Sequence, residues 1–371
     1  MLILAFISCG KQKKNENCPM IQLDLAETAS LDKIFSKIEI VSLQNRGDVI
    51  LPDVSQLVVT DQYFLVKDSK GIVYVYTKDG SLVSNSLKKM GNGTGEYSIV
   101  TALGFNPYAK NIEILTPRDL LCYDFQFNLI KKEPLPVKSS DSGKNIIFFA
   151  QIYDLSAERH ILVPTSVSEN TDKMLIYNSS LSKVEQELDY TDEFIAGINM
   201  QEQCFFESDN GVVIAPPFVT EYLYTFDKDK MQLAKLYRID NGSKGIQKSE
   251  LSKLDTEELQ NFLLDTEKEI PVAKFVTNKY VTLLMKSGRS LRNWHYVFYD
   301  KSSGSVKKIK CFVGKENVFP IIKNADSEAL FAVVENTDLN RIISYMKKNN
   351  IKVDSKSSVD GDYSILKYVF K

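Results

Sequence analysis

Short segments rich in β-branched and aromatic residues recur along most of the chain, and each ends at a polar turn, as β-strands do. An aromatic residue stands just before the turn at five landmarks: Tyr76, Tyr123, Tyr177, Phe226 and Tyr299. The landmarks are 47, 54, 49 and 73 residues apart, and the first three spacings fit one four-stranded propeller blade per repeat. The pattern therefore predicts an all-β propeller.

Two segments break the strand pattern with a helical period. The longest spacing contains a segment at about 246–268 whose apolar residues recur at three- and four-residue intervals. Subtracting roughly two dozen residues for this insertion restores the period of the other repeats. A second amphipathic helix is predicted at 337–349, where Leu339, Ile342, Ile343 and Met346 share one face.

The last repeat lacks one strand. Its three predicted strands lie at 318–324, 329–334 and 363–370, and Tyr368 on the last of them is a sixth landmark. The missing fourth strand is predicted at 37–44, KIEIVSLQ, near the start of the chain. Pairing the first strand with the last blade closes the ring and removes an exposed sheet edge. We predict one six-bladed β-propeller domain over 21–371, with four-stranded blades and two short helical insertions.

Composition narrows the classes of function. The chain has 371 residues, of which 43% are hydrophobic, so it can bury a large core. With 46 basic against 48 acidic residues, its net charge of −2 gives no support for nucleic-acid binding. No cysteine stands in a metal-ligand spacing and the chain has 2 histidines, so we predict no metal and no cofactor. Four cysteines are expected to be free thiols: Cys18, Cys122, Cys204 and Cys311.

The first twenty residues bear on location. Residues 2–7 are apolar but too few to span a bilayer, which needs about 20 residues. They run into Ser8-Cys9-Gly10 and a polar tail, which resembles the end of a bacterial lipoprotein signal. This interpretation makes 1–20 a truncated signal and tether, with a start codon further upstream and Cys9 acylated. The alternative is a ragged apolar start of a cytoplasmic protein. The basic tail after Cys9 favours the periplasmic side of the outer membrane over the cell surface.

Four segments together resemble a known family. They are LDKIFSKIEIVSLQ at 31–44, VYVYTKDGSLV at 73–83, GNGTGEY at 91–97 and YSILKYVFK at 363–371. In this order they resemble the six-bladed β-propeller lipoproteins of Bacteroidetes, which are similar in shape to NHL-repeat propellers. Thr94 stands where the family usually has proline, and Asp362 where an Asn-Pro pair is common. The resemblance implies an extracytoplasmic propeller without an agreed biochemical activity.

Candidate binding residues come from the connections that one face of such a propeller would carry. Arg289, Arg292 and Trp294 concentrate cationic and aromatic side chains in one hairpin, which suits a carboxylate, a sulfated sugar or a peptide terminus. Arg118 and Tyr97 are further candidates on the same face. The alternatives are a solvated turn for the hairpin, an Arg118–Asp119 ion pair, and blade packing for the aromatic residues.

Other motifs offer weaker signals. The glycines of 91–97 could present backbone N–H groups to a phosphate, but no P-loop ending or helix follows, so a tight turn between blades is favoured. His160 reads as the start of a strand, without a nucleophile elbow beside it. Asp189, Asp192 and Glu193 are expected to solvate a loop.

Two functions remain open. The preferred one is a non-catalytic, lipid-anchored monomer of the cell envelope that binds a peptide, glycan or protein partner on its loop-elaborated face. The alternative is a propeller hydrolase or lyase that acts on glycans or peptides at the channel mouth. A pair of carboxylates about 5–10 Å apart in a deep cleft would favour the enzyme.

Overall fold

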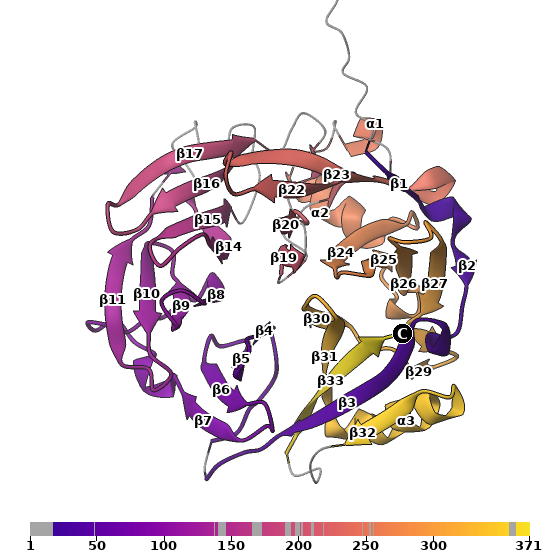
Figure 1. Ribbon diagram of the computed structural model, residues 1–371, viewed down its shortest axis with the longest axis horizontal. Helices are drawn as coiled ribbons and strands as arrows, with labels where there is room; N and C mark the ends of the chain where they lie inside the picture. Colours follow the sequence, from indigo (N-terminus) through magenta and orange to yellow (C-terminus); the bar gives the residue numbers. More distant parts are fainter. Residues whose placement is uncertain are drawn as a thin grey trace, which may run out of the picture.

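Six β-sheets surround a central axis like the blades of a wheel in the computed structural model (Figure 1). The structure describes residues 18–47, 49–136, 138–139, 146–164, 173–189, 194–196, 201, 203–208, 211–217, 219–246, 248–251, 254, 256–355 and 361–371. The predicted six-bladed β-propeller is confirmed. We number the blades 1 to 6 in chain order, beginning with the sheet at residues 56–85.

Blades 1 to 3 are four-stranded antiparallel sheets whose strands follow the chain from the axis outwards. Blade 1 contains β4 (Gln56–Val59), β5 (Tyr63–Lys67), β6 (Val73–Thr77) and β7 (Leu82–Asn85). Blade 2 contains β8 (Ala102–Asn106), β9 (Asn111–Leu115), β10 (Asp119–Tyr123) and β11 (Leu129–Pro134). Blade 3 contains β14 (Phe149–Asp154), β15 (Arg159–Pro164), β16 (Lys173–Asn178) and β17 (Lys183–Asp189).

Blades 4 to 6 have the same four-stranded plan with a fifth strand on the outer side. Blade 4 contains β19 (Phe205–Ser208), β20 (Gly211–Ile214), β22 (Tyr222–Asp227), β23 (Gln232–Asp240) and β1 (Met20–Gln22). Blade 5 contains β24 (Ile270–Val276), β25 (Tyr280–Lys286), β26 (His295–Asp300), β27 (Val306–Lys310) and β2 (Glu27–Thr28). Blade 6 contains β30 (Ile322–Ala325), β31 (Ala329–Glu335), β33 (Tyr363–Phe370), β3 (Phe35–Leu43) and β32 (Lys352–Ser355).

The ring closes as predicted, because β3 from the start of the chain pairs antiparallel with β33 at its end. Ile38 lies opposite Tyr368 and Ile40 opposite Leu366. Both isoleucines are buried, so one hydrophobic face fixes the register. The joint removes the free edge that blade 6 would otherwise present.

The fifth strands were not predicted. β1, β2 and β32 each pair in parallel with the fourth strand of their blade. Residues 20–28 therefore run along the outside of blades 4 and 5 before the chain enters blade 6 as β3 (Figure 1). The start of the chain binds three consecutive blades together.

Helical and short elements occupy the connections between strands. The helices are α1 (Lys248–Leu251), α2 (Thr256–Asp265) and α3 (Asn336–Lys348), and the 3-10 turns are η1 (Leu23–Leu25), η2 (Leu31–Lys33), η3 (Leu87–Lys89), η4 (Gly242–Lys244) and η5 (Leu291–Asn293). Three short ladders join β12 (Lys138–Ser139) to β13 (Ile146–Ile147), β18 (Phe194–Ala196) to β21 (Val219–Thr220), and β28 (Phe312–Val313) to β29 (Glu316–Asn317). No helix among the described residues is long and apolar enough to cross a membrane.

The second helical insertion, α3, lies in the connection from β31 to β33, the second and third strands of blade 6. The helix packs at the outer rim of the disc, beside β32 (Figure 1). Leu339, Ile342 and Met346 are buried on its inner side, so the helix extends the core of blade 6 outwards.

One fully buried tyrosine marks the third strand of every blade: Tyr76, Tyr123, Tyr177, Tyr224, Tyr296 and Tyr368. Four of the six were predicted landmarks. In blade 4 the predicted Phe226 is buried together with Tyr224. In blade 5 the buried residue is Tyr296, whereas the predicted Tyr299 is half-buried. The two differ by an odd number of positions, so they lie on opposite faces of the strand.

Candidate functional site

The connections from second to third strand and from fourth strand to the next blade emerge on one face of the disc, which we call the loop face. α2 lies in the connection from blade 4 to blade 5, and the 287–294 hairpin turn joins β25 to β26 in blade 5. Helix and hairpin therefore elaborate the same sector of the loop face.

The predicted cationic hairpin holds the end of α2. The Lys286 ammonium donates to the carbonyl oxygens of Leu263 at 2.7 Å and Leu264 at 3.1 Å. Arg289 forms an ion pair with Asp265, with Nη2 and Oδ2 3.0 Å apart. Burial lowers the pKa of Lys286. Cations at a helix C-terminus satisfy its last carbonyl groups, so these two side chains already have a structural role.

The backbone of the hairpin contributes to the same contact. The Gly288 N–H donates to the Thr266 carbonyl at 2.7 Å, and the Ser287 hydroxyl donates to the Glu267 carbonyl at 2.6 Å. Gly288 has a φ of 62°, and a Cβ there would lie 2.8 Å from a carboxylate oxygen of Glu267. Glycine is favoured at this positive φ, and the turn packs against the end of α2 at Gly288 while residues 289–293 are exposed to solvent, as the solvated-turn alternative predicts.

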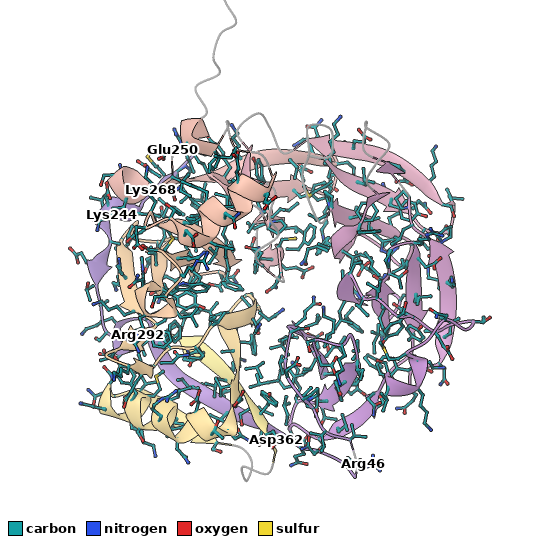
Figure 2. The ribbon with its side chains drawn as sticks, turned by 180° about the vertical axis from the view of Figure 1, so that it is seen from behind. Arg46, Lys244, Glu250, Lys268, Arg292 and Asp362 are labelled. Carbon is teal, nitrogen blue, oxygen red and sulfur yellow. The ribbon has the colours of Figure 1, made fainter. Side chains whose placement is uncertain are left out.

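Arg292 is the cation of the hairpin that remains available. Its backbone N–H bonds to the Ser290 hydroxyl oxygen at 3.4 Å, which caps η5. Its side chain is exposed, and within the described part of the chain no ion pair involves its guanidinium. Figure 2 places it in blade 5, away from the Lys268–Glu250 ion pair. η5 lies against β28, so Leu291, Arg292 and Val313 form an exposed group that we call the blade 5 patch.

Trp294 and His295 lie beneath this surface. Trp294 is half-buried against the core, and its indole N–H is a buried donor without a hydrogen-bond partner among the described residues. The His295 Nε2 atom lies 3.9 Å from a carboxylate oxygen of Glu269. Burial, together with the charge of Lys308, lowers the pKa of His295 to about 4, so its imidazole is neutral at neutral pH.

Exposed apolar side chains concentrate on the loop face. Among the described residues 12 large hydrophobic side chains are exposed. Seven of these lie in connections of the loop face: Ile50, Leu87, Ile99, Leu264, Leu291, Val313 and Ile321. The others, at the rim or on the opposite face, are Met20, Leu25, Tyr108, Ile130 and Leu181. The seven on the loop face are spread over the connections of several blades, and Leu291 and Val313 lie in neighbouring segments of blade 5.

Arg118 and Tyr97 are not brought to the blade 5 patch. Arg118 is exposed in the turn between β9 and β10 of blade 2, on the opposite side of the ring (Figure 1). Its expected partner Asp119 pairs with Lys132 instead, at 3.0 Å. Tyr97 is 3% exposed, and its hydroxyl lies 2.5 Å from the Ser86 hydroxyl in the seam between blades 1 and 2.

The glycine loop at 91–97 is filled by its own acidic residue. The Gly93 N–H donates to the Glu96 carboxylate at 2.9 Å, and a Cβ on Gly91 would lie 2.2 Å from the same carboxylate. The Gly91 N–H donates to the Tyr97 carbonyl at 3.0 Å. A carboxylate in this position repels an incoming phosphate, which agrees with the turn interpretation.

A buried polar cluster was missed at the sequence level. His160 is fully buried, with Nδ1 2.6 Å from Asp154 Oδ1 and Nε2 3.1 Å from the Ser179 hydroxyl. Glu113 lies beside them, 4.0 Å from His160 Nδ1. The order Ser–His–Asp matches that of hydrolase triads, but all three side chains are buried in a blade seam where no substrate could reach the serine.

Three residues singled out in the sequence lie outside the described residues: Cys9, Asp192 and Glu193. Cys122, Cys204 and Cys311 are buried thiols, and Cys18 is half-buried.

Comparison with known proteins gives a family for the chain and structural neighbours from Bacteroides. The profile of a family described as "Domain of unknown function (DUF4934)" matches residues 20–362. A crystal structure from Bacteroides fragilis NCTC 9343, provisionally described as an exported protein, is 15% identical, with a TM-score of 0.69 over 95% of this chain and 99% of that one. A DUF4221 family member from Bacteroides vulgatus is 10% identical, with a TM-score of 0.52 over 92% and 99%. No curated protein matches the chain.

Proposed function

The chain belongs to the DUF4934 family, and from that premise we propose that it is a non-catalytic binding propeller of the cell envelope. Its loop face would hold a peptide, glycan or protein partner, and the blade 5 patch would be the centre of the contact. The observation that carries the proposal is the pair of exposed apolar side chains Leu291 and Val313, in the same patch as an arginine without an ion-pair partner among the described residues.

The chemistry of the patch favours a partner with apolar and carboxylate groups. Leu291 and Val313 are 47% and 50% exposed, so each can bury further apolar area on binding. Arg292, in the same patch, can donate two parallel hydrogen bonds to a carboxylate or sulfate. The α2–hairpin contact holds η5 in place, which lowers the entropy lost on binding.

The patch can be tested by site-specific crosslinking in the native host. A photo-crosslinking residue at position 291 should trap a partner, whereas the same residue at position 181, exposed on the opposite face, should not. Arg292→Glu should reduce the yield at position 291 by roughly tenfold, since it reverses the charge at the contact. Equal trapping at both positions, or an unchanged yield in Arg292→Glu, would remove the loop face as the binding surface.

We also propose that the protein is an anchored lipoprotein of the NHL-like propeller type, acylated at Cys9 and held on the periplasmic side of the outer membrane. The provisional description of the Bacteroides fragilis relative as exported supports an envelope location. Metabolic labelling with a palmitate analogue should mark the wild type and not Cys9→Ser. An unlabelled wild-type chain would exclude the anchor.

A further inference from the structure

The cluster of Glu113, Asp154 and His160 joins two blades. Glu113 stands on β9 of blade 2, while Asp154 on β14 and His160 on β15 lie opposite each other in blade 3. All three side chains are buried, with at most 6% of their surface exposed. One nitrogen or oxygen atom from each lies within 4.8 Å of the other two.

The surrounding backbone is built to bring these groups together. Gly104 on β8 lies opposite Glu113 in the ladder, and a Cβ there would meet Ile152 of blade 3 at 2.6 Å. Glycine therefore allows β14 to approach β8 closely. The Asn106 side-chain amide donates to Glu113 Oε1 at 3.1 Å, which orients that carboxyl group toward the seam.

The charges of the cluster are not balanced by nearby cations. The surrounding titratable groups are Cys122 on β10, Lys131 and Glu133 on β11, and Glu158 in the β14–β15 turn. Lys131 pairs with Glu133 at 3.1 Å. Apart from His160 itself, no cationic side chain in the described part of the chain forms an ion pair with Glu113 or Asp154. Two carboxyl groups thus share a seam with one imidazole.

The hydrogen bonds of the cluster leave one buried carboxylate oxygen without a partner. Glu113 Oε2 is buried without a hydrogen-bond partner among the described residues. The Ser179 hydroxyl donates to the Glu158 carbonyl at 3.2 Å, so its oxygen can accept from His160 Nε2. An N–H on Nδ1 would donate to Asp154 Oδ1, 2.6 Å away, which is the distance of a charge-assisted hydrogen bond. A cation bound by Nδ1 would replace that proton and bring a positive charge close to Glu113 Oε2 as well.

We propose that Glu113, Asp154 and His160 hold one divalent transition-metal ion, of the class represented by Zn²⁺. Imidazole nitrogen with carboxylate oxygens suits this class, at ligand distances of about 2.0–2.2 Å. Ser179 would orient the imidazole from its other nitrogen, as outer partners of metal-bound histidines do. Because the site is closed to solvent, the ion would be structural and join blade 2 to blade 3, with one carboxylate binding through both oxygens to complete four ligand atoms.

The proposal revises the expectation that the chain binds no metal. That expectation rested on the absence of a ligand motif with regular spacing. Residues 113, 154 and 160 come from two blades, so they are too far apart in the sequence to form a compact ligand motif.

Metal content of the whole, tag-free protein, purified without chelator, tests the site directly. Elemental analysis should find about one Zn²⁺ per chain. His160→Gln should reduce the content by roughly tenfold or more, and so should the nearly isosteric Glu113→Gln. His295→Gln is the matched control, because His295 is also buried but lies in blade 5, and it should keep the metal.

A second measurement tests the proposal on the wild-type protein, in case a variant does not fold. Wild-type protein stripped by chelator should regain thermal stability when Zn²⁺ is added, and Glu113→Gln should not respond. A wild type with less than about one tenth of an equivalent of metal and no response to Zn²⁺ would overturn the proposal. A proton shared by Glu113 and Asp154 would then fill the same gap between the acceptors.

Discussion

The two halves of the ring are built differently. Blades 4 to 6 carry fifth strands and share one continuous hydrophobic core, which includes Ile21 and Phe35 from the start of the chain. Blades 1 to 3 have four strands each, and separate apolar clusters fill their seams. The smallest of these clusters fills the seam between blades 2 and 3, where the Glu113–Asp154–His160 cluster also lies.

This difference shows two ways of holding neighbouring blades together. In the five-stranded half, the chain start adds strands to consecutive blades, so opening one blade disturbs the next. In the four-stranded half, each seam depends on its own contacts, and in one seam polar groups replace part of the apolar surface. Seams with few apolar contacts are where local opening is expected first.

The largest expected effect comes from cutting the shared core. Phe35 is 1% exposed, and its ring lies 5.3 to 5.6 Å from those of Phe298, Phe319, Tyr368 and Phe370. Phe35→Ala should lower the free energy of unfolding in urea by about 4–5 kcal/mol, because the cavity opens between two blades.

Phe127→Ala provides the comparison in the other half. Phe127 is also 1% exposed, but its ring packs in the seam between blades 1 and 2, with Tyr123 at 6.0 Å. We expect a smaller loss, about 3 kcal/mol, at the low end for a buried phenylalanine. Equal losses in the free energy of unfolding for the two variants would mean that neighbouring blades are coupled equally strongly in both halves.

The next effect concerns a buried lysine in the five-stranded half, which should make the free energy of unfolding depend on pH. Burial lowers the pKa of Lys274 in blade 5 from 10.5 to about 7, while its ammonium donates to the Pro216 carbonyl at 2.9 Å. Between these two pKa values the unfolded chain binds a proton that the folded chain does not, so stability increases with pH. From pH 7 to 9 the free energy of unfolding should rise by about 2–3 kcal/mol more than in Lys274→Met. Parallel pH profiles for the two proteins would contradict this.

A smaller effect measures how tightly the polar seam is closed. Gly104→Ala would place a methyl group 2.6 Å from Ile152 Cγ2 and push blade 3 away from blade 2. We expect a cost of about 2 kcal/mol in urea unfolding. In an Ile152→Ala background most of this cost should disappear, because the clash is removed. A cost that persists in the double variant would assign it to the backbone of β8 instead.

The global fold could be predicted because each blade has a local sequence signal, and because the number of predicted strands shows that one is missing from the last blade. Each blade repeats an aromatic residue before a turn, and the last blade lacks a strand that 37–44 supplies. The fifth strands could not be predicted, since β1 and β2 have only three and two residues and pair with strands about 200 residues or more away. The sequence predicts Tyr299 as the landmark of blade 5, where the structure buries Tyr296, because the position of a turn does not show which strand face is buried.

The candidate site was predicted in part. The sequence places Arg289, Arg292 and Trp294 in one hairpin, but only tertiary structure shows that Lys286 and Arg289 hold α2 and that Arg292 stays exposed. The cluster around His160 left no signal, because its members are separated in sequence and meet only when blades 2 and 3 pack.

The smallest effect on stability is expected at the outer edge strands of the blades, where a substitution should change association instead. Among the described strands β11 ends its sheet, and Ile130 and Lys132 on it are exposed. Lys132→Val should change the free energy of unfolding by less than about 0.5 kcal/mol. It should nevertheless cause concentration-dependent association, measured by light scattering after size exclusion. Without the charge on this edge strand, the edge can pair with a strand of another chain. Lys307→Val on β27 is the matched control, since β2 covers that edge with Glu27 opposite Lys307. If both variants associate equally, the fifth strand does not protect blade 5; if neither does, the open edge of β11 is not the vulnerable one.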